Sequence, residues 1–268
     1  MPDASDIEVV VFDILGTMVD EPGGLRAAIR DAVPATDDAS VDQLLTVWQE
    51  HVEHEQRHME EQSRAYANTE TIDREAAQRV ADCAGLTDPA AIDRLATASR
   101  RLKPWDDSLT GLTRLARRFP VLGLSNASRT TLLHLNAHAG LRWHQALSAE
   151  EARAHKPAPE VYRLATDAAG CPPERVLKIA AHAWDLRGAQ ATGMRTAYVH
   201  RPVGDAPKST DTFDWQSNSV SGTLCVPEGF RPAGAGPGAG CGPRTPRPPG
   251  APGPRRTPPP RDPPCAAS

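Results

Sequence analysis

Several features that would assign this chain to a membrane, secreted or repeat class are missing from its sequence. No apolar run among the 268 residues approaches the length of a membrane span, and residues 1–6 lack the basic stretch that opens a secretory signal. No segment recurs with the period of a solenoid repeat. These absences predict a soluble, cytoplasmic protein with no membrane partner.

Cysteine is also scarce, and the five cysteines are not clustered. Cys83 and Cys171 lie far apart in the body of the chain, and Cys225, Cys241 and Cys265 lie in or near its C-terminal region. A disulfide framework or a zinc site is recognised by characteristic short spacings. The sequence therefore predicts neither.

Most of the chain has no excess of basic over acidic residues. Residues 231–268 hold six of the 30 basic residues, one of the 34 acidic residues and half of the 26 prolines. The rest of the chain has 24 basic against 33 acidic residues, a formal charge of −9. Because phosphate binding needs a basic face, this balance argues against nucleic acid as a partner of the folded body.

The C-terminal region, residues 218–268, is predicted to be a disordered tail, because from residue 231 it is mostly Pro, Gly, Ala and Arg. Two interpretations stay open. Its prolines favour polyproline II and would suit a binding arm for an SH3-like or nucleic-acid partner. Alternatively, the segment is unselected GC-rich coding sequence, even a shifted reading frame. On the second interpretation, we expect whatever normally closes the domain after Trp215 to be replaced or lost.

The most informative segment spans residues 9–17. A run of valines and a phenylalanine, short enough for one buried strand, ends at Asp13, and Gly16 and Thr17 then turn the chain. Ligands of open α/β sheets bind at the carboxyl ends of the strands, so Asp13 is a candidate nucleophile. The alternative is that Asp13 only caps a turn.

The middle of the chain, residues 21–102, has helical patterns and no strand pattern. One helix has an apolar stripe that is typical of core packing, and two more are predicted over residues 72–84 and 89–102. The stripe consists of Leu45, Trp48, Val52 and Met59. We predict a helical cap domain over residues 18–103.

From residue 105 onward, helices alternate with short apolar strands at 121–124, 146–148, 176–180 and 196–199. Strands separated by helices form parallel βαβ units. The predicted fold is α/β, with a Rossmann-like, doubly wound parallel sheet built from residues 1–17 and 104–217, an inserted helical cap and a disordered C-terminal tail.

Polar residues follow four of the predicted strands. In a parallel sheet the strand ends share one edge, so Asp13, Ser125, Asn126, Lys156 and Asp185 are expected to converge. An aspartate can attack an electrophile, a lysine can hold the attacking carboxylate, and Ser and Asn can donate hydrogen bonds. Taken singly, each residue could instead be a cap or a solvated side chain.

The segments FDILGT, LSNAS, HKPAPEVY and AAHAWDLRGA resemble the haloacid dehalogenase superfamily. The pair Trp184–Asp185 after a strand is similar to the type II L-2-haloacid dehalogenases, and the resemblance covers about residues 7–202. It implies that Asp13 is the nucleophile, flanked by Thr17 and Ser125. It further implies that Asn126 contacts the substrate carboxylate, Lys156 steadies Asp13, and Asp185 assists hydrolysis.

The implied reaction is the displacement of halide from a small 2-haloacid by Asp13, followed by hydrolysis of the ester to a 2-hydroxy acid. This scheme needs no metal or cofactor, and the resemblance implies a homodimer. Phosphatases of the superfamily usually have a second Asp two residues after the nucleophile, where this chain has Leu15. Because halide leaves without a proton, Leu15 favours carbon–halogen cleavage. Two alternatives stay open: a magnesium-dependent phosphatase-like hydrolase, and a non-catalytic protein that retains the fold.

Three positions depart from the dehalogenase pattern. Gln49 follows Trp48 where the family carries an Arg clamp, and an amide cannot replace that charge. Leu15 stands where an aromatic wall is usual, and Ala-Ala-His at residues 180–182 replaces Ser-Ser-Asn. The substrate-binding set predicted from these motifs is Leu15, Thr17, Trp48, Gln49, Asn126, His182 and Trp184.

Side chains of the cap and of the last motif offer partial replacements. His51, Arg57 or Arg64 could supply the missing cation, or could simply form a solvated helix face. His182 could activate water at neutral pH, or could bind a backbone group. Trp184 is expected to form a wall of the pocket.

Overall fold

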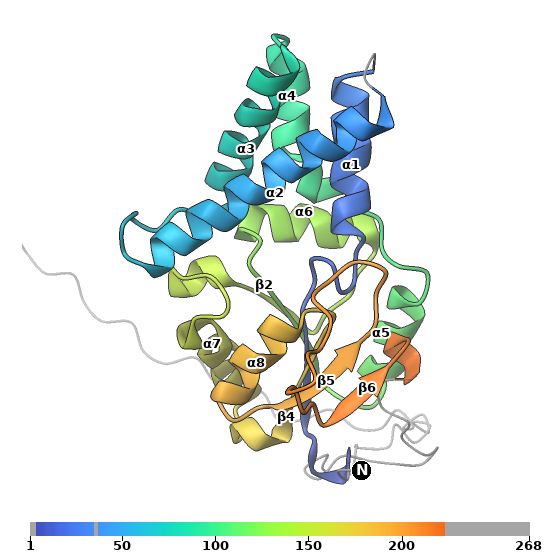
Figure 1. Cartoon of the computed structure of the whole chain (residues 1–268). Helices are drawn as coiled ribbons and strands as arrows, with labels where there is room; N and C mark the ends of the chain where they lie inside the picture. Colours follow the sequence, from blue (N-terminus) through green and yellow to red (C-terminus); the bar gives the residue numbers. More distant parts are fainter. Residues whose placement is uncertain (1–3, 35–36, 223–268) are drawn as a thin grey trace, which may run out of the picture. The chain divides into compact units, whose positions relative to one another are not determined.

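A six-stranded parallel sheet forms the centre of the computed structural model, which describes residues 4–34 and 37–222 (Figure 1). Its order is β3-β2-β1-β4-β5-β6, so the connections reverse direction between β1 and β4. Such a reversal opens a crevice at the carboxyl ends of the strands. The strands are β1 (Val9–Phe12), β2 (Val121–Ser125), β3 (Gln145–Ser148), β4 (Val176–Ala180), β5 (Arg195–Val199) and β6 (Trp215–Ser217).

Helices cover both faces of the sheet, because successive residues of a buried strand point to opposite sides. Val10 and Phe12 pack in one cluster with leucines of α5 (Ser108–Ala116) and α6 (Arg129–Ala139). Val9 and Val11 pack in another cluster with residues of α7 (Pro159–Ala169) and with Ala189 of α8 (Ala183–Ala191). The predicted doubly wound α/β fold is confirmed.

A short sixth strand, which was not predicted, forms one edge of the sheet. β6 pairs with β5, and the 3₁₀ turn Val220–Gly222 follows it. Val220 is fully buried in the core, and its N–H donates to the Asp107 carboxylate at 2.7 Å. Val220 is therefore packed in the core although it falls within the predicted tail of residues 218–268, while Asn218 and Gly222 are exposed. Residues 223–268 lie outside the described residues.

Residues 21–101 form a separate group of helices, seen together at the top of Figure 1. They share one apolar cluster, to which Ile29, Trp48, Ala77 and Leu95 contribute. The side chains that precede the four α-helices accept backbone N–H hydrogen bonds and so fix where each helix begins. The elements are α1 (Glu21–Ala32), α2 (Asp38–Glu60), α3 (Thr69–Ala84), α4 (Pro89–Ala96) and a 3₁₀ turn (Ala98–Arg101).

The structure changes one detail of this segment. The helix predicted over residues 89–102 ends at Ala96 and gives way to the 3₁₀ turn. The division of the chain into a core of residues 1–17 and 104–217 and a cap of residues 18–103 stays a prediction. Within the described residues, no helix combines the length and the apolar character needed to cross a membrane.

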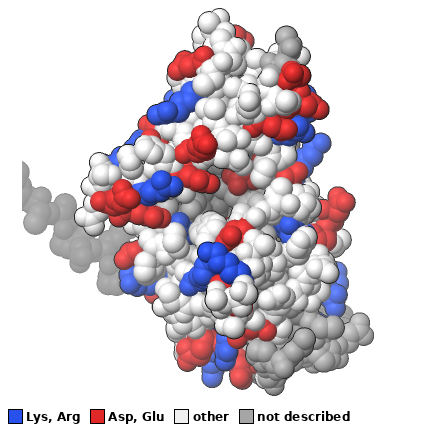
Figure 2. All heavy atoms as spheres, viewed as in Figure 1, with Lys and Arg blue, Asp and Glu red and all other residues white. Residues whose placement is uncertain are grey.

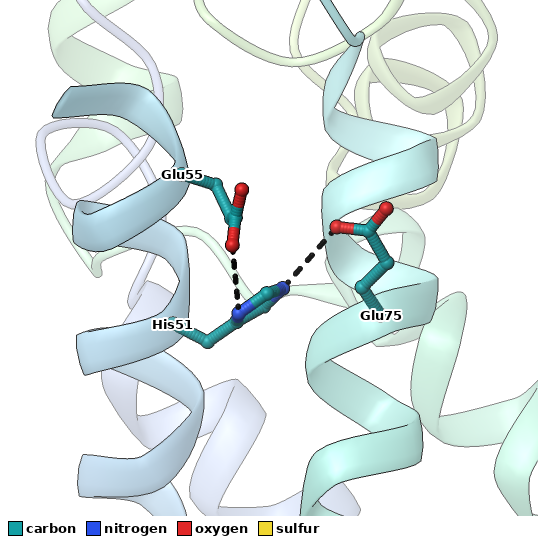
Figure 3. A group of neighbouring side chains, drawn as sticks. All are labelled: His51, Glu55 and Glu75. Atoms are coloured by element: carbon teal, nitrogen blue, oxygen red, sulfur yellow. Dashed lines mark ion pairs between the residues drawn. The ribbon is translucent and has the colours of Figure 1, made fainter. Parts of the chain in front are cut away.

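The buried face of α2 differs from the predicted stripe. Of the four predicted residues only Trp48 is buried, and the buried positions are Val41, Leu44, Trp48, His51 and Glu55. Each of the two polar residues lies next to a charged side chain outside α2. His51 lies between Glu55 of its own helix and Glu75 of α3, with nitrogen–oxygen distances of 3.6 Å and 3.3 Å (Figure 3). His51 is therefore not part of a solvated helix face.

Arg64 completes this group from the loop between α2 and α3. Its guanidinium donates to the carboxylates of both Glu55 and Glu75. We expect Arg64→Met to lower the free energy of unfolding by about 1–2 kcal/mol, because two partly buried carboxylates lose their charged donor. Urea denaturation at pH 7 measures this loss.

The matched control for this prediction is Arg57→Met, since the Arg57 side chain is exposed at the end of α2. It should change the free energy of unfolding by less than about 0.5 kcal/mol. Equal losses for the two variants would show that the Arg64 contacts contribute nothing specific.

Candidate active site

Four of the predicted polar residues meet at the carboxyl edge of the sheet. Asp13 follows β1, Asn126 follows β2, Lys156 lies in the loop beyond β3, and Asp185 lies in the first turn of α8 beyond β4. The Asn126 side-chain oxygen accepts a hydrogen bond from the Lys156 backbone N–H at 2.8 Å. The topology therefore brings together residues that are up to 172 positions apart in the chain.

Lys156 joins the two carboxylates at the centre of this group. Its Nζ lies 2.6 Å from Asp13 Oδ1 and 2.7 Å from Asp185 Oδ2, and all three side chains are buried. Burial alone would lower the pKa of Lys156, but the two carboxylates outweigh it and hold that pKa above its usual range. Lys156 is thus a permanent cation, and its ammonium occupies the space between Asp13 and Asp185.

The second oxygen of Asp13 is held by Thr17. The Thr17 hydroxyl donates to Asp13 Oδ2 at 2.5 Å and accepts the Ala181 N–H at 2.9 Å. Thr17 is fully buried and does not line the cavity described below. Thr17 therefore contacts Asp13 from the side away from the cavity lining, and its predicted contact with a substrate stays a prediction.

Asp185 is held by two further residues that the motifs did not single out. Lys178 Nζ of β4 lies 3.1 Å from Asp185 Oδ2, and the Tyr162 hydroxyl of α7 donates to Asp185 Oδ1 at 2.8 Å. Although burial opposes it, the charges of Lys156 and Lys178 lower the pKa of Asp185 to about 2. The sequence does mark Lys178, because it is the one charged residue in the apolar run 176–180.

A cavity of about 180 Å³ opens beside Asp13, between the sheet edge and the helices of residues 21–101. The sheet side contributes Asp13, Leu15, Asn126, Ala127, Thr131, Lys156, His182 and Trp184. The helical side contributes Glu21, Val52, Gln56, Thr69, Asp73 and Ser99. On the face seen in Figure 2, basic and acidic side chains alternate without a continuous basic surface.

His182 reaches the cavity because Gly16 leaves room for it. Gly16 has φ +73°, and a Cβ at this position would lie 2.5 Å from His182 Nε2. That nitrogen lies 3.3 Å from the Leu15 carbonyl oxygen, which can only accept a hydrogen bond. In the neutral ring Nε2 therefore carries the proton, and Nδ1 is left as the acceptor.

Three other predicted site residues lie away from the cavity. Ser125 is buried at the end of β2, where its hydroxyl accepts the Ala127 N–H at 3.1 Å. Trp48 packs in the apolar cluster of the cap helices, and Gln49 is exposed on the surface of α2. The rotation of α2 places Val52 and Gln56 against the cavity instead. Trp48 and Gln49 thus do not line the cavity, and their contacts with a substrate stay a prediction.

Two acidic residues on the helical side were also missed. Glu21 begins α1, and Asp73 of α3 accepts a hydrogen bond from the Ser99 hydroxyl at 3.1 Å. Burial raises the pKa of each carboxyl to about 7. On the sequence alone, both residues look like ordinary acids near helix N-termini.

The raised pKa of Asp73 makes stability depend on pH. Asp73 ionises near pH 3.8 when unfolded but near 7 when folded, so stability is lost as the pH rises between these values and stays lost above 7. We expect Asp73→Asn to raise the melting temperature by several degrees at pH 8 and much less at pH 4.5. A control substitution, Asp106→Asn, affects an exposed side chain and should show no such difference. An equal change for Asp73→Asn at both pH values would contradict this account.

Among the described residues, one group of side chains has the composition and spacing of a metal site, namely His51, Glu55 and Glu75. None of these residues lines the cavity beside Asp13. Arg64 is already paired with both glutamates. The group therefore has no place in the chemistry of the cavity.

Comparisons with known proteins agree with this arrangement. Residues 7–193 match the family described as haloacid dehalogenase-like hydrolase. The chain is 30% identical to haloacetate dehalogenase H-2 of Moraxella sp. over 202 residues, which cover 73% of this chain and 86% of the relative. It is 28% identical to (S)-2-haloacid dehalogenase H-109 of Pseudomonas putida over 199 residues, with 73% and 86% covered.

Solved structures show the same likeness. The crystal structure of a defluorinating L-2-haloacid dehalogenase superposes with a TM-score of 0.73 at 28% identity. The superposition covers 80% of this chain and 92% of that structure.

Proposed function

Because this chain belongs to the haloacid dehalogenase-like hydrolases, we propose that it hydrolyses the carbon–halogen bond of a small 2-haloacid through an ester on Asp13. One observation carries the proposal. Asp13 lines the cavity while Lys156 and Thr17 hold its two oxygens, and the neighbouring lining residue Leu15 cannot donate a proton. This arrangement suits a leaving group that departs as an anion.

In the first step, a carboxylate oxygen of Asp13 attacks C2 of the substrate. The oxygen lone pair forms the new O–C bond, and the carbon–halogen electron pair leaves with the halide. The negative charge moves from Asp13 to the halide while Lys156 keeps the carboxyl group in place. Asn126 can assist, since its oxygen is engaged by the Lys156 N–H and its Nδ2 is left to donate to the substrate carboxylate.

In the second step, water attacks the ester carbonyl carbon of Asp13. The acyl C–O bond of the ester then breaks, and the departing alkoxide takes back a proton from the group that deprotonated the water, so that the product leaves as the 2-hydroxy acid. The new carboxyl group of Asp13 loses its proton to solvent and becomes a carboxylate again. Asp185 is fully buried and, unlike Asp13, does not line the cavity, so we assign it to positioning Lys156. His182 lines the cavity with Nδ1 available, and we assign it to accepting the proton of the attacking water.

The full-length protein incubated with L-2-chloropropionate tests the proposal. Chloride should be released at the same rate with and without EDTA, and one turnover in H₂¹⁸O should leave ¹⁸O in the Asp13 carboxyl group, as measured by peptide mass spectrometry. Absence of chloride release would contradict the proposal. Hydrolysis of p-nitrophenyl phosphate that depends on magnesium would instead support the phosphatase alternative.

The assignment of His182 leads to a separate prediction. His182→Gln should slow hydrolysis of the ester more than its formation, by about 10²-fold or more, because the water loses its base. Covalently modified protein should then accumulate and be detected as a mass increase of the intact chain. His200→Gln, at an exposed position, is the control and should accumulate none. If the ester does not accumulate in His182→Gln, His182 is not the base.

The oligomeric state and the cellular location of the protein were also predicted from the sequence. The homodimer implied by the resemblance and the cytoplasmic location expected from the sequence both stay predictions. Size-exclusion chromatography with light scattering measures the first.

A further inference from the structure

The charge balance of the cavity suggests what the substrate carries beyond its reacting carbon. Lys156 is the one permanent cation among the residues that line the cavity, and its Nζ is already bound to both Asp13 and Asp185. None of the described residues that line the cavity is an arginine. The helical side, which faces the sheet edge, contributes two carboxyl groups instead, Glu21 and Asp73.

Among the described residues, none forms an ion pair with either of these two carboxyl groups. Asp73 is 9% exposed and has only the neutral Ser99 hydroxyl as a donor. Arg100 lowers the pKa of Asp73, but its guanidinium is paired with Glu70. No described residue donates a hydrogen bond to the Glu21 carboxylate. Burial, Asp73 and Asp13 raise its pKa, whereas His182 and Lys156 lower it.

A desolvated carboxylate without a counter-ion is costly, and a ligand cation that supplies one recovers part of that cost. Burial is the largest cause of the raised pKa of both Glu21 and Asp73, which agrees with this cost of desolvation. A simple alkyl haloacid would place only apolar surface against these two carboxyls. A substrate with an ammonium group would instead donate charge-assisted hydrogen bonds to them.

We propose that the cavity accepts a 2-haloacid whose other end carries an ammonium group, bound by Glu21 and Asp73. The inference rests on the proposed function for the reacting end of the substrate. Asp13 and Asn126 would meet the halogen-bearing carbon and its carboxylate, and the helical side would select the substituent.

Binding of halogen-free ligands tests the inference apart from catalysis. The probes are ω-amino acids from 3-aminopropanoate to 6-aminohexanoate, each compared with the carboxylate in which CH₃ replaces NH₃⁺, from butanoate to heptanoate. At pH 8 we expect at least one amino acid to bind the full-length protein about 10-fold or more tightly than its partner, as measured by calorimetry. Glu21→Gln and Asp73→Asn should each reduce this ratio, and the double variant should abolish it.

The control variant is Glu53→Gln, which removes an exposed negative charge from α2 and should leave the ratio unchanged. Because Asp73→Asn is expected to be at least as stable as the wild type, a lost preference cannot come from unfolding. Equal binding within every pair, or a preference that survives in the double variant, would overturn the inference.

Turnover separates this inference from the proposed function. Chloride release should be about 10-fold or more faster, in kcat/KM, for 6-amino-2-chlorohexanoate than for 2-chloroheptanoate. Chloride release from 2-chloropropionate without any ammonium preference in binding or turnover overturns only the inference. Ammonium preference in binding, with no chloride release from any of these compounds, overturns the dehalogenase function and keeps the assignment of Glu21 and Asp73.

Discussion

Asp13→Asn should reduce chloride release from L-2-chloropropionate by at least about 10³-fold, because the carboxamide has no anionic oxygen to form the ester. The substitution keeps the shape of the side chain. Its oxygen can still accept from Lys156, and its nitrogen can donate to the Thr17 hydroxyl. The loss should therefore lie in kcat, with a folded protein shown by an unchanged circular dichroism spectrum.

Asp106→Asn is the matched control, since it makes the same chemical change at an exposed position. It should retain wild-type turnover. Activity of Asp13→Asn within tenfold of the wild type would rule out Asp13 as the nucleophile. The same variant should also incorporate no ¹⁸O at residue 13 in a single turnover.

Lys156→Met should have the second largest effect, on both activity and stability. The variant leaves the buried carboxylates of Asp13 and Asp185 without the ammonium that joins them. Breaking a buried ion pair from one side typically costs about 3–5 kcal/mol. We expect a loss near the lower end of that range in guanidinium denaturation, because Lys178 still lies 3.1 Å from Asp185. Chloride release should fall by about 10²-fold or more, because Asp13 loses its partner.

Lys178→Met is the control, because it removes a second buried lysine that belongs to the same group of charges. Lys178 is equally buried but contacts Asp185 and not Asp13. Burial lowers the pKa of Lys178 to about 8, so its charge costs more to keep than that of Lys156. Its removal should therefore destabilise the protein less and should reduce turnover less. A larger loss of turnover for Lys178→Met than for Lys156→Met would contradict the role given to Lys156.

Much of the fold could be predicted because its signals are local. Each buried strand is a short run of β-branched or apolar residues, and the glycines at 85, 140 and 170 end helices in the left-handed conformation. Since parallel strands share their carboxyl edge, the convergence of Asp13, Asn126, Lys156 and Asp185 followed from strand order. β6 was missed, because it is only three residues long and follows a stretch without strand character.

The sequence by itself therefore determined the parallel sheet, the helical insertion and the central carboxylate–lysine group. The tertiary structure decided which side chains of the helices face the cavity. The apolar periodicity of a helix does not fix the rotation of the helix about its own axis. Packing of α2 against its neighbours sets that rotation, which places Trp48 in the apolar cluster, Gln49 on the surface and Gln56 against the cavity. Likewise, Glu21 and Asp73 became part of the cavity only because α1 and α3 pack over the sheet edge. Desolvation and charge balance arise from that packing, so the chemistry of the helical side could not be read from local sequence.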